Sequence, residues 1–265
     1  MPYHLLRLNL IAVGVMQKKY WFYGLLMLIL GGLLFYDVTH NYVDWRTADR
    51  SSAGIAPSPD AEKRAVVQLY VARTYNWRKY FAVHPWIAVK EKNAKSYTVY
   101  QVLGFKQWRT GNAVDVKKDI PDRHWYGMKP VLLQDLRGEE AEKAISEIKK
   151  AVETYPFAQE YRVFPGPNSN TFVSYIIRHV PELTVELPPI AIGKDFIGYD
   201  TFLTKTESGK GYQISFWGVL SVTFGKAEGL EINILGLVFG VDFLRPALKL
   251  PFVGRLGVSD APLDD

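Results

Sequence analysis

The stretch GPNSNTFVSYIIRHV, residues 166–180, joins a tight turn to an apolar segment with helical spacing. Gly166 and Pro167 are typical turn residues, and the spacing of the apolar positions after them predicts a helix that ends near Pro181. Ser169 stands where this helix begins. Two interpretations stay open: Ser169 caps the helix, or its hydroxyl is a nucleophile beside free backbone N–H groups and the positive end of the helix dipole.

The segments around this helix predict an α+β domain over residues 65–257. Residues 65–75, 80–90 and 96–105 alternate like half-buried strands, and residues 138–155 have the i, i+3, i+4 pattern of an amphipathic helix. The last third of the domain again has strand-like patterns. The order of these segments favours antiparallel strands with helices packed against them.

The N-terminal part differs in composition and predicts a membrane anchor. Residues 20–36 carry no charge and have aromatic residues at both ends, as expected for a helix that crosses about 30 Å of hydrocarbon. We therefore expect a cytoplasmic segment at 1–19, a transmembrane signal anchor at 20–38, a linker at 39–64 and a tail at 258–265. The basic residues before the anchor predict a single-pass protein of a bacterial inner membrane whose domain faces the periplasm.

Composition argues against several kinds of site. The chain has no cysteine, so thiolate metal sites and a cysteine nucleophile are excluded. The five histidines show no metal-ligand spacing, and there is no glycine-rich phosphate loop, so we expect no metal and no cofactor. The net charge of +5 is spread among acidic residues, so no nucleic-acid partner is expected.

Candidate site residues are few. A serine nucleophile needs a neighbouring base, and His84 in the strand FAVHPWIAV is the best candidate. A solvent-facing or hydrogen-bonded strand histidine is the alternative interpretation. His124, in the loop segment PDRHWYG, is a weaker candidate, and His179 has the place of a helix C-terminal cation.

Four segments carry a resemblance to a known family: FAVHPWIAVK, HWYG, YRVFPGPNSNTFV and AIGKDF. At these segments the chain resembles a bacterial family catalogued as domain of unknown function 3750, over roughly residues 65–257. That family label implies no activity.

More distantly, the chain resembles circularly permuted papain-like proteins, the NlpC/P60 and lecithin–retinol acyltransferase-like group. In these proteins a strand with a histidine precedes an N-C-x-x-F motif that opens a helix. The resemblance implies a permuted papain-like domain with Ser169 in the place of the nucleophilic cysteine and His84 as its base. Tyr100 or Gln101, on the next strand, would be the third catalytic group. Five further residues would contact the substrate: Trp86, His124, Asn168, Asn170 and Asp195.

Two functions follow as expectations. The first is an envelope hydrolase or acyltransferase that uses Ser169 and His84 on an amide or ester of a lipid, a lipoprotein or peptidoglycan. The second is a catalytically inactive binding module of the same fold at the membrane surface. Residues 230–257 are very apolar: they form a buried strand and an end helix, or they rest on the lipid bilayer with Arg245, Lys249 and Arg255 near headgroups.

Overall fold

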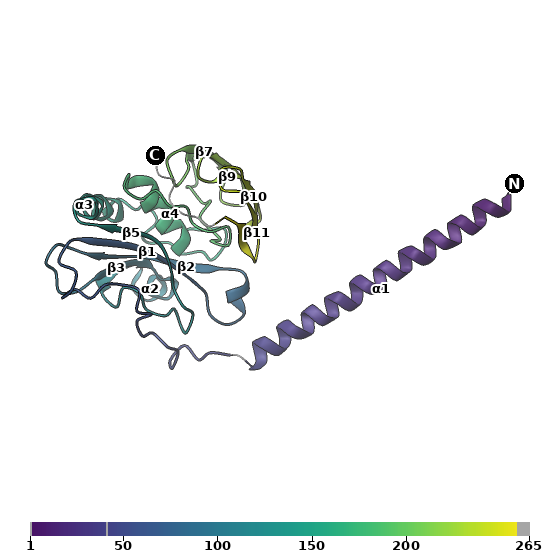
Figure 1. The fold of residues 1–265 in the computed structure, drawn as a ribbon, viewed down its shortest axis with the longest axis horizontal. Coiled ribbons are helices and arrows are strands. Elements are labelled where there is room, and N and C mark those ends of the chain that lie inside the picture. Colours follow the sequence, from purple (N-terminus) through teal and green to yellow (C-terminus); the bar gives the residue numbers. More distant parts are fainter. Residues whose placement is uncertain (1, 41, 259–265) are drawn as a thin grey trace. The chain divides into compact units, whose positions relative to one another are not determined.

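The computed structural model describes residues 2–40 and 42–258, and the chain divides into two compact units. The first unit ends at Asp44 and the second begins at Trp45. The first unit contains one helix, and all the described strands belong to the second (Figure 1).

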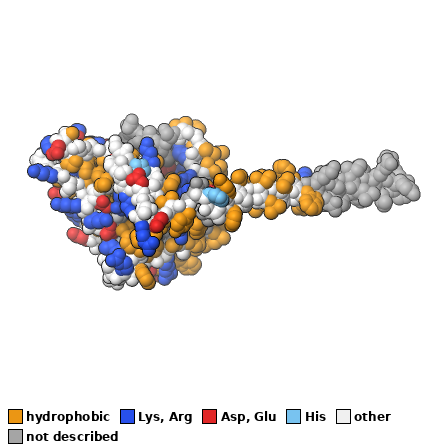
Figure 2. Space-filling view, turned by 90° about the horizontal axis from the view of Figure 1, so that it is seen from below, with side chains coloured by type: hydrophobic (Ala, Val, Ile, Leu, Met, Phe, Trp, Pro, Cys, Tyr) orange, Lys and Arg blue, Asp and Glu red, His pale blue; other side chains and the backbone are white. Residues whose placement is uncertain are grey.

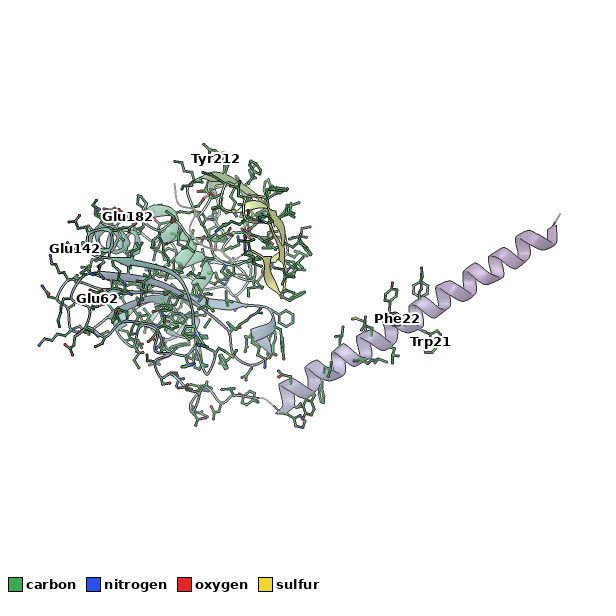
Figure 3. All side chains as sticks on the ribbon, in the orientation of Figure 1. Trp21, Phe22, Glu62, Glu142, Glu182 and Tyr212 are labelled. Atoms are coloured by element: carbon green, nitrogen blue, oxygen red, sulfur yellow. The ribbon has the colours of Figure 1, made fainter. Side chains whose placement is uncertain are left out.

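Helix α1, Pro2–His40, contains the segment for which the sequence predicts a membrane anchor. Its part Lys19–Asp37 has a mean hydropathy of 1.4, and none of its described side chains is buried. Figure 2 shows apolar side chains along this part, and Trp21 and Phe22 project from it in Figure 3. By length and composition the helix can cross a membrane, and a signal sequence near an N-terminus has the same two properties.

The first sheet is antiparallel, with the strand order β4-β3-β2-β1-β5. Its strands are β1 Val66–Arg73, β2 Val83–Lys90, β3 Thr98–Val102, β4 Val114–Lys118 and β5 Val131–Arg137. A short 3-10 helix, η1 Asn76–Tyr80, joins β1 to β2, and α2, Gly104–Thr110, follows β3. Nearly every residue of β1 and β2 is buried, so both faces of the sheet are covered.

Different segments cover the two faces of this sheet. Helices α3, Glu139–Glu153, and α4, Ser169–His179, pack on one face, where their apolar side chains join Leu69, Ile87 and Val102 in the larger core. We call this the helix face. The opposite face, which we call the loop face, carries a smaller core with Tyr70, Trp86, Val99 and Trp125. Residues 55–56 pack against that smaller core.

The second sheet is an antiparallel meander of seven strands in sequence order. Its strands are β6 Leu203–Lys205, β7 Gly211–Phe216, β8 Leu220–Gly225, β9 Gly229–Ile234, β10 Leu237–Asp242, β11 Ala247–Leu250 and β12 Gly254–Gly257. Helix α4 also contacts this part of the chain, because Arg178 donates hydrogen bonds to the Lys205 carbonyl and the Gln213 side chain. In Figure 1, α4 lies between the two sheets.

The α+β class, the antiparallel sheets and the two helices after residue 138 are confirmed. Two other expectations were wrong. The polar segment 106–130, for which the sequence predicts irregular structure, contains most of α2 and the whole of β4, and 230–257 forms strands β9–β12 with no end helix. Within the expected linker 39–64, the backbone N–H groups of Ile55 and Ala56 donate hydrogen bonds to Asp122. Residues 259–265, most of the expected tail, lie outside the described residues.

Candidate functional site

The start of α4 is capped by Asn168, not by Ser169 as one interpretation expected. The Asn168 side-chain oxygen accepts hydrogen bonds from the N–H groups of Asn170, at 2.9 Å, and Thr171, at 3.2 Å. The Thr171 hydroxyl accepts one in return from the Asn168 N–H, which completes a capping box. Ser169 is therefore the first residue of the helix rather than its cap.

The loop at residues 192–193 is tied to this helix start. Asn168 and Asn170 both donate side-chain hydrogen bonds to the Ile192 carbonyl, and the Thr171 hydroxyl donates to the Gly193 carbonyl. Gly193 has φ +97°, and a Cβ there would overlap the Asn168 amide, so a side chain at 193 is incompatible with the cap. The side chains of Asn168 and Asn170 therefore connect the start of α4 to the loop at residues 192–193.

Ser169 is 5% exposed, and its hydroxyl makes no hydrogen bond with any residue that the structure describes. We expect Ser169→Ala to change the free energy of unfolding by less than about 0.5 kcal/mol. Asn168→Ala removes the cap and the hydrogen bond to the Val163 carbonyl, while the Ile192 carbonyl keeps its bond from Asn170, so the variant should lower that free energy by about 2 kcal/mol. Urea unfolding of the full chain in a neutral detergent, followed by circular dichroism, measures both. Equal losses would contradict the assignment of the cap to Asn168.

His84 lies on the loop face of the first sheet. Its ring stacks on Trp125 with centroids 3.6 Å apart, and its Nε2 donates a hydrogen bond to the Gln101 side-chain oxygen at 3.2 Å. Burial is the main cause that lowers the pKa of His84 to about 3; the bond to Gln101 partly opposes it, and nearby Arg123 adds to it. At neutral pH the imidazole is therefore uncharged and a weak proton acceptor.

The structure does not join Ser169 and His84 in a dyad. The neighbours of His84 along β2, Val83 and Ile87, belong to the core beneath α4, whereas His84 points to the loop face with Trp86. Strand alternation therefore places the imidazole on the side of the sheet opposite the helix that carries Ser169. Its described hydrogen-bond partner is Gln101.

Tyr100 and Gln101 are the two candidates for a third catalytic group. They are consecutive residues of β3, so their side chains lie on opposite faces of the sheet. Gln101 shares the loop face with His84, and its amide donates to Asp115 while its oxygen accepts from Arg123. Tyr100 belongs to the core under the helices, where burial raises the pKa of its hydroxyl. Of these two candidates, Gln101 is the one whose side chain is hydrogen-bonded to His84.

The remaining predicted site residues are dispersed. The Trp86 indole donates to the Pro121 carbonyl, and His124 contacts the Ser51 carbonyl and lies 3.4 Å from the Asp49 carboxylate. Asp195 is buried under the second sheet, where it accepts hydrogen bonds from Gln213 and Asn233. Asp195 anchors that sheet, and no described hydrogen bond or ion pair links it to His84. Within the described ranges no group of three metal-ligating side chains occurs.

The side chains of Arg245, Lys249 and Arg255, which the sequence placed near headgroups if 230–257 met a bilayer, are largely buried in ion pairs. The Lys249 ammonium is fully buried and bonds to both oxygens of Glu186 and to Glu231, each at 2.7 Å. Lys194 binds the other oxygen of Glu231 at 2.6 Å. Arg255 and Arg245 pair with Asp242. These charges line the inner side of the second sheet.

The outer side of that sheet has the opposite character. The strand register aligns Leu203, Ile214, Val222, Ile232 and Phe239 in one row across β6–β10, and all five are 41–58% exposed. A second row begins with exposed Lys205 at the β6 edge and continues with Tyr212, Phe224, Leu230, Val241, Leu248 and Leu256. We call these two rows the outer face. Figure 3 shows Tyr212 at the outside of β7, and in Figure 2 apolar side chains gather on the side where Figure 1 places β9–β11.

The outer face escaped the sequence analysis because alternation alone does not say which side of a strand meets the protein. In YQISF, residues 212–216, either Tyr212 and Ile214 or Gln213 and Ser215 can point inward. The usual rule buries the apolar set. Here Gln213 and Ser215 are the buried ones.

Comparison with known proteins places the chain in a family without a known activity. A family model described as "Protein of unknown function (DUF3750)" matches residues 64–196, half of the chain, and the chain belongs to this family. The match ends before the second sheet, so it is shorter than the range 65–257 expected from the sequence. No curated protein and no solved structure matches the chain.

Proposed function

We propose that this member of the family is a binding module at a membrane surface: α1 anchors it in the bilayer, and the outer face of the second sheet rests on lipid acyl chains. The inverted sheet is the observation that carries this proposal. In an antiparallel sheet with one solvated side, the apolar side chains normally face the protein and the polar ones face water. Here the outer rows are apolar, and buried charges such as Lys249 and Glu231 lie on the inner side.

The outer face is large for a surface in contact with water. Seven strands with a spacing of about 4.8 Å and a length of about six residues give it roughly 30 by 20 Å, or ~600 Å². The largest apolar patch of a typical monomer reaches about 300–600 Å², and such patches commonly mark interaction sites. A face of this size therefore needs a partner that removes it from water.

The chemistry of the outer face fits lipid better than protein. An interface between proteins carries about one hydrogen bond per 100–200 Å² and a polar rim. Apart from Lys205 at the β6 edge of the sheet, the two rows contain one hydrogen-bonding side chain, that of Tyr212, and no charge. Exposed Trp217, Phe243 and Phe252 lie in the turns between the strands, and aromatic residues favour the boundary between headgroups and acyl chains. A domain joined to a membrane helix also stays close to the bilayer.

Single-cysteine labelling tests this contact directly, because the natural chain has no cysteine. The full chain is placed in vesicles with an environment-sensitive fluorophore on Val222→Cys, and separately on Val131→Cys as the matched control. Val222 is 44% exposed on the outer face, and Val131 is 58% exposed on β5 of the other sheet. Bromine atoms on the lipid acyl chains quench nearby fluorophores, so we expect stronger quenching at 222 than at 131.

Equal quenching at the two positions would overturn the proposal. A blue shift at 222 that grows with protein concentration, without quenching by brominated lipid, would assign the outer face to a second copy of the chain and would overturn it too. The comparison of quenching at 222 and 131 does not depend on whether α1 spans the bilayer, because both labelled positions belong to the same chain with the same helix α1.

The serine hydrolase or acyltransferase is the second candidate. A free Ser169 hydroxyl at a capped helix start favours it, and so does the order of the histidine strand, the amphipathic helix and the serine helix, which fits a permuted papain-like domain. The place of His84 on the opposite face, with its lowered pKa, argues against it. Lipid, lipoprotein and peptidoglycan substrates, and the periplasmic orientation, stay predictions from the sequence.

A further inference from the structure

The loop face of the first sheet carries a cavity of about 720 Å³ that no proposed function uses. Its walls come from the segment 45–50, from α2 and from residues 123–126. A volume of this size is typical of small-molecule sites, which commonly measure about 300–1,000 Å³. Two kinds of side chain, basic and aromatic, line it, and this combination indicates the chemistry of its ligand.

The first kind is cationic. Five lining residues are basic and none is acidic; the basic ones are Arg50, Arg109, Lys117, Arg123 and His124. Behind the cavity wall, Asp119 pairs with Arg123 at 2.6 Å and with Lys117 at 3.2 Å, and Asp49 lies beside His124. Within residues 42–258, Arg50 and Arg109 have no carboxylate partner. Two guanidinium groups thus line the cavity without a paired carboxylate, and that of Arg50 donates a hydrogen bond to the Trp45 carbonyl.

The second kind is aromatic. Six aromatic side chains line the same cavity: Trp45, Tyr75, Phe105, Trp108, Trp125 and Tyr126. Trp108 is 86% exposed on α2, where a residue of its size gains nothing from the core. Arg50 lies over the ring of Tyr126, with its guanidinium carbon 4.5 Å from the ring centroid. The aromatic walls and the two guanidinium groups without a carboxylate partner therefore line the same cavity.

We propose that this cavity binds an amphipathic anion, a single carboxylate or phosphate attached to an apolar body. Arg50 and Arg109 hold the anionic group through charge-assisted hydrogen bonds, and the rings of Trp108 and Trp125 cover the apolar body. The proposal does not depend on membrane contact through the second sheet, because the cavity is built from the first sheet and its loops.

Calorimetric titration of the full chain in a neutral detergent tests the site with four probes. The probes are octanoate, octyl phosphate, inorganic phosphate and 1-octanol, each corrected with protein-free micelles. We expect saturable binding of octanoate or octyl phosphate, and their ratio tells a carboxylate source from a phosphate source. We expect 1-octanol and inorganic phosphate to bind at least about tenfold more weakly, because each lacks one half of the recognised ligand.

Variants assign the binding to this cavity. The double variant Arg50→Gln with Arg109→Gln should weaken binding of the octyl anion about tenfold or more, whereas Lys118→Gln, an exposed lysine outside the cavity, should leave it unchanged. Trp108→Ala should weaken the binding of the octyl anions without changing that of inorganic phosphate, and because Trp108 is 86% exposed, its removal leaves the core intact. Octyl anions that bind no better than 1-octanol, or binding that the double variant leaves intact, would overturn the proposal.

Discussion

Replacing Lys249 by methionine should lower the free energy of unfolding by about 3–5 kcal/mol, because it removes the ammonium that two buried carboxylates share. Lys249 is 0% exposed and bonds to Glu186, Glu231 and the Glu228 carbonyl. Burial by itself lowers the pKa of Lys249, but the carboxylates of Glu231 and Glu186 outweigh it and the net pKa is raised. The ammonium is therefore charged at neutral pH. Its removal takes away positive charge next to two carboxylates that are buried and poorly solvated.

A matched control and a double variant separate this cause from the loss of a lysine. Lys143→Met, on the exposed side of α3, should change the free energy by less than about 0.5 kcal/mol. Adding Glu186→Gln to Lys249→Met should restore part of the loss, since Glu231 retains Lys194 at 2.6 Å and the neutral amide at 186 needs no counter-charge. Urea unfolding of the full chain measures all three variants. Additive losses in the double variant would show that the buried charges are not coupled.

The network around Lys249 also explains why the second sheet is inverted. Glu186, Lys194 and Asp195 come from the segment before β6, and they hold the inner side of the sheet through charges rather than apolar contacts. Such a network fixes which side of each strand faces inward, because a register slip of one residue would bring charges to the outer face. The apolar rows are then left outside, where the proposed lipid contact covers them.

Part of the fold could be predicted from the sequence, because the periodicity of a helix and its capping residues depend only on neighbouring residues. The amphipathic pattern of 138–155 and the Asn-rich turn before Phe172 specify α3 and α4 without reference to the rest of the chain. The strand pattern placed His84 and Trp86 on one face, and the structure confirms this. The regular structure within 106–130 was missed because α2 and β4 are short and their residues are mostly polar.

The candidate site was less predictable because it depends on which face of a sheet a helix covers. The motifs around His84 and Ser169 identify two candidate residues. They do not indicate that α4 packs against the face of the sheet that carries Val83 and Ile87, rather than the face that carries the imidazole. The outer face and the cavity depend in the same way on long-range packing. Trp108 and Arg109 stand in a polar segment of the sequence that gives no sign of the space they line.

His84 should make the stability of the domain fall steeply in acid. Its folded pKa is about 3, whereas an unfolded histidine titrates near 6.5. Between these two values the unfolded chain binds a proton that the folded chain does not, so each pH unit of acidification costs about 1.4 kcal/mol from this group alone. Above pH 6.5 both states are neutral and the contribution does not change. Between pH 6.5 and pH 4 the loss should total about 3 kcal/mol.

His84→Gln isolates this contribution, because glutamine keeps a side-chain donor for Gln101 but does not titrate. The free energy of unfolding of the full chain is measured with urea at pH 7, 5.5 and 4 for the wild type and for the variant. Other titrating groups affect both chains equally, so the difference between them reports on residue 84. We expect the variant to be the less stable chain at pH 7, where it loses the stacking on Trp125, and to gain about 3 kcal/mol relative to the wild type by pH 4. A difference that stays constant with pH would show that the imidazole is accessible to protons in the folded state, and would restore His84 as a candidate base.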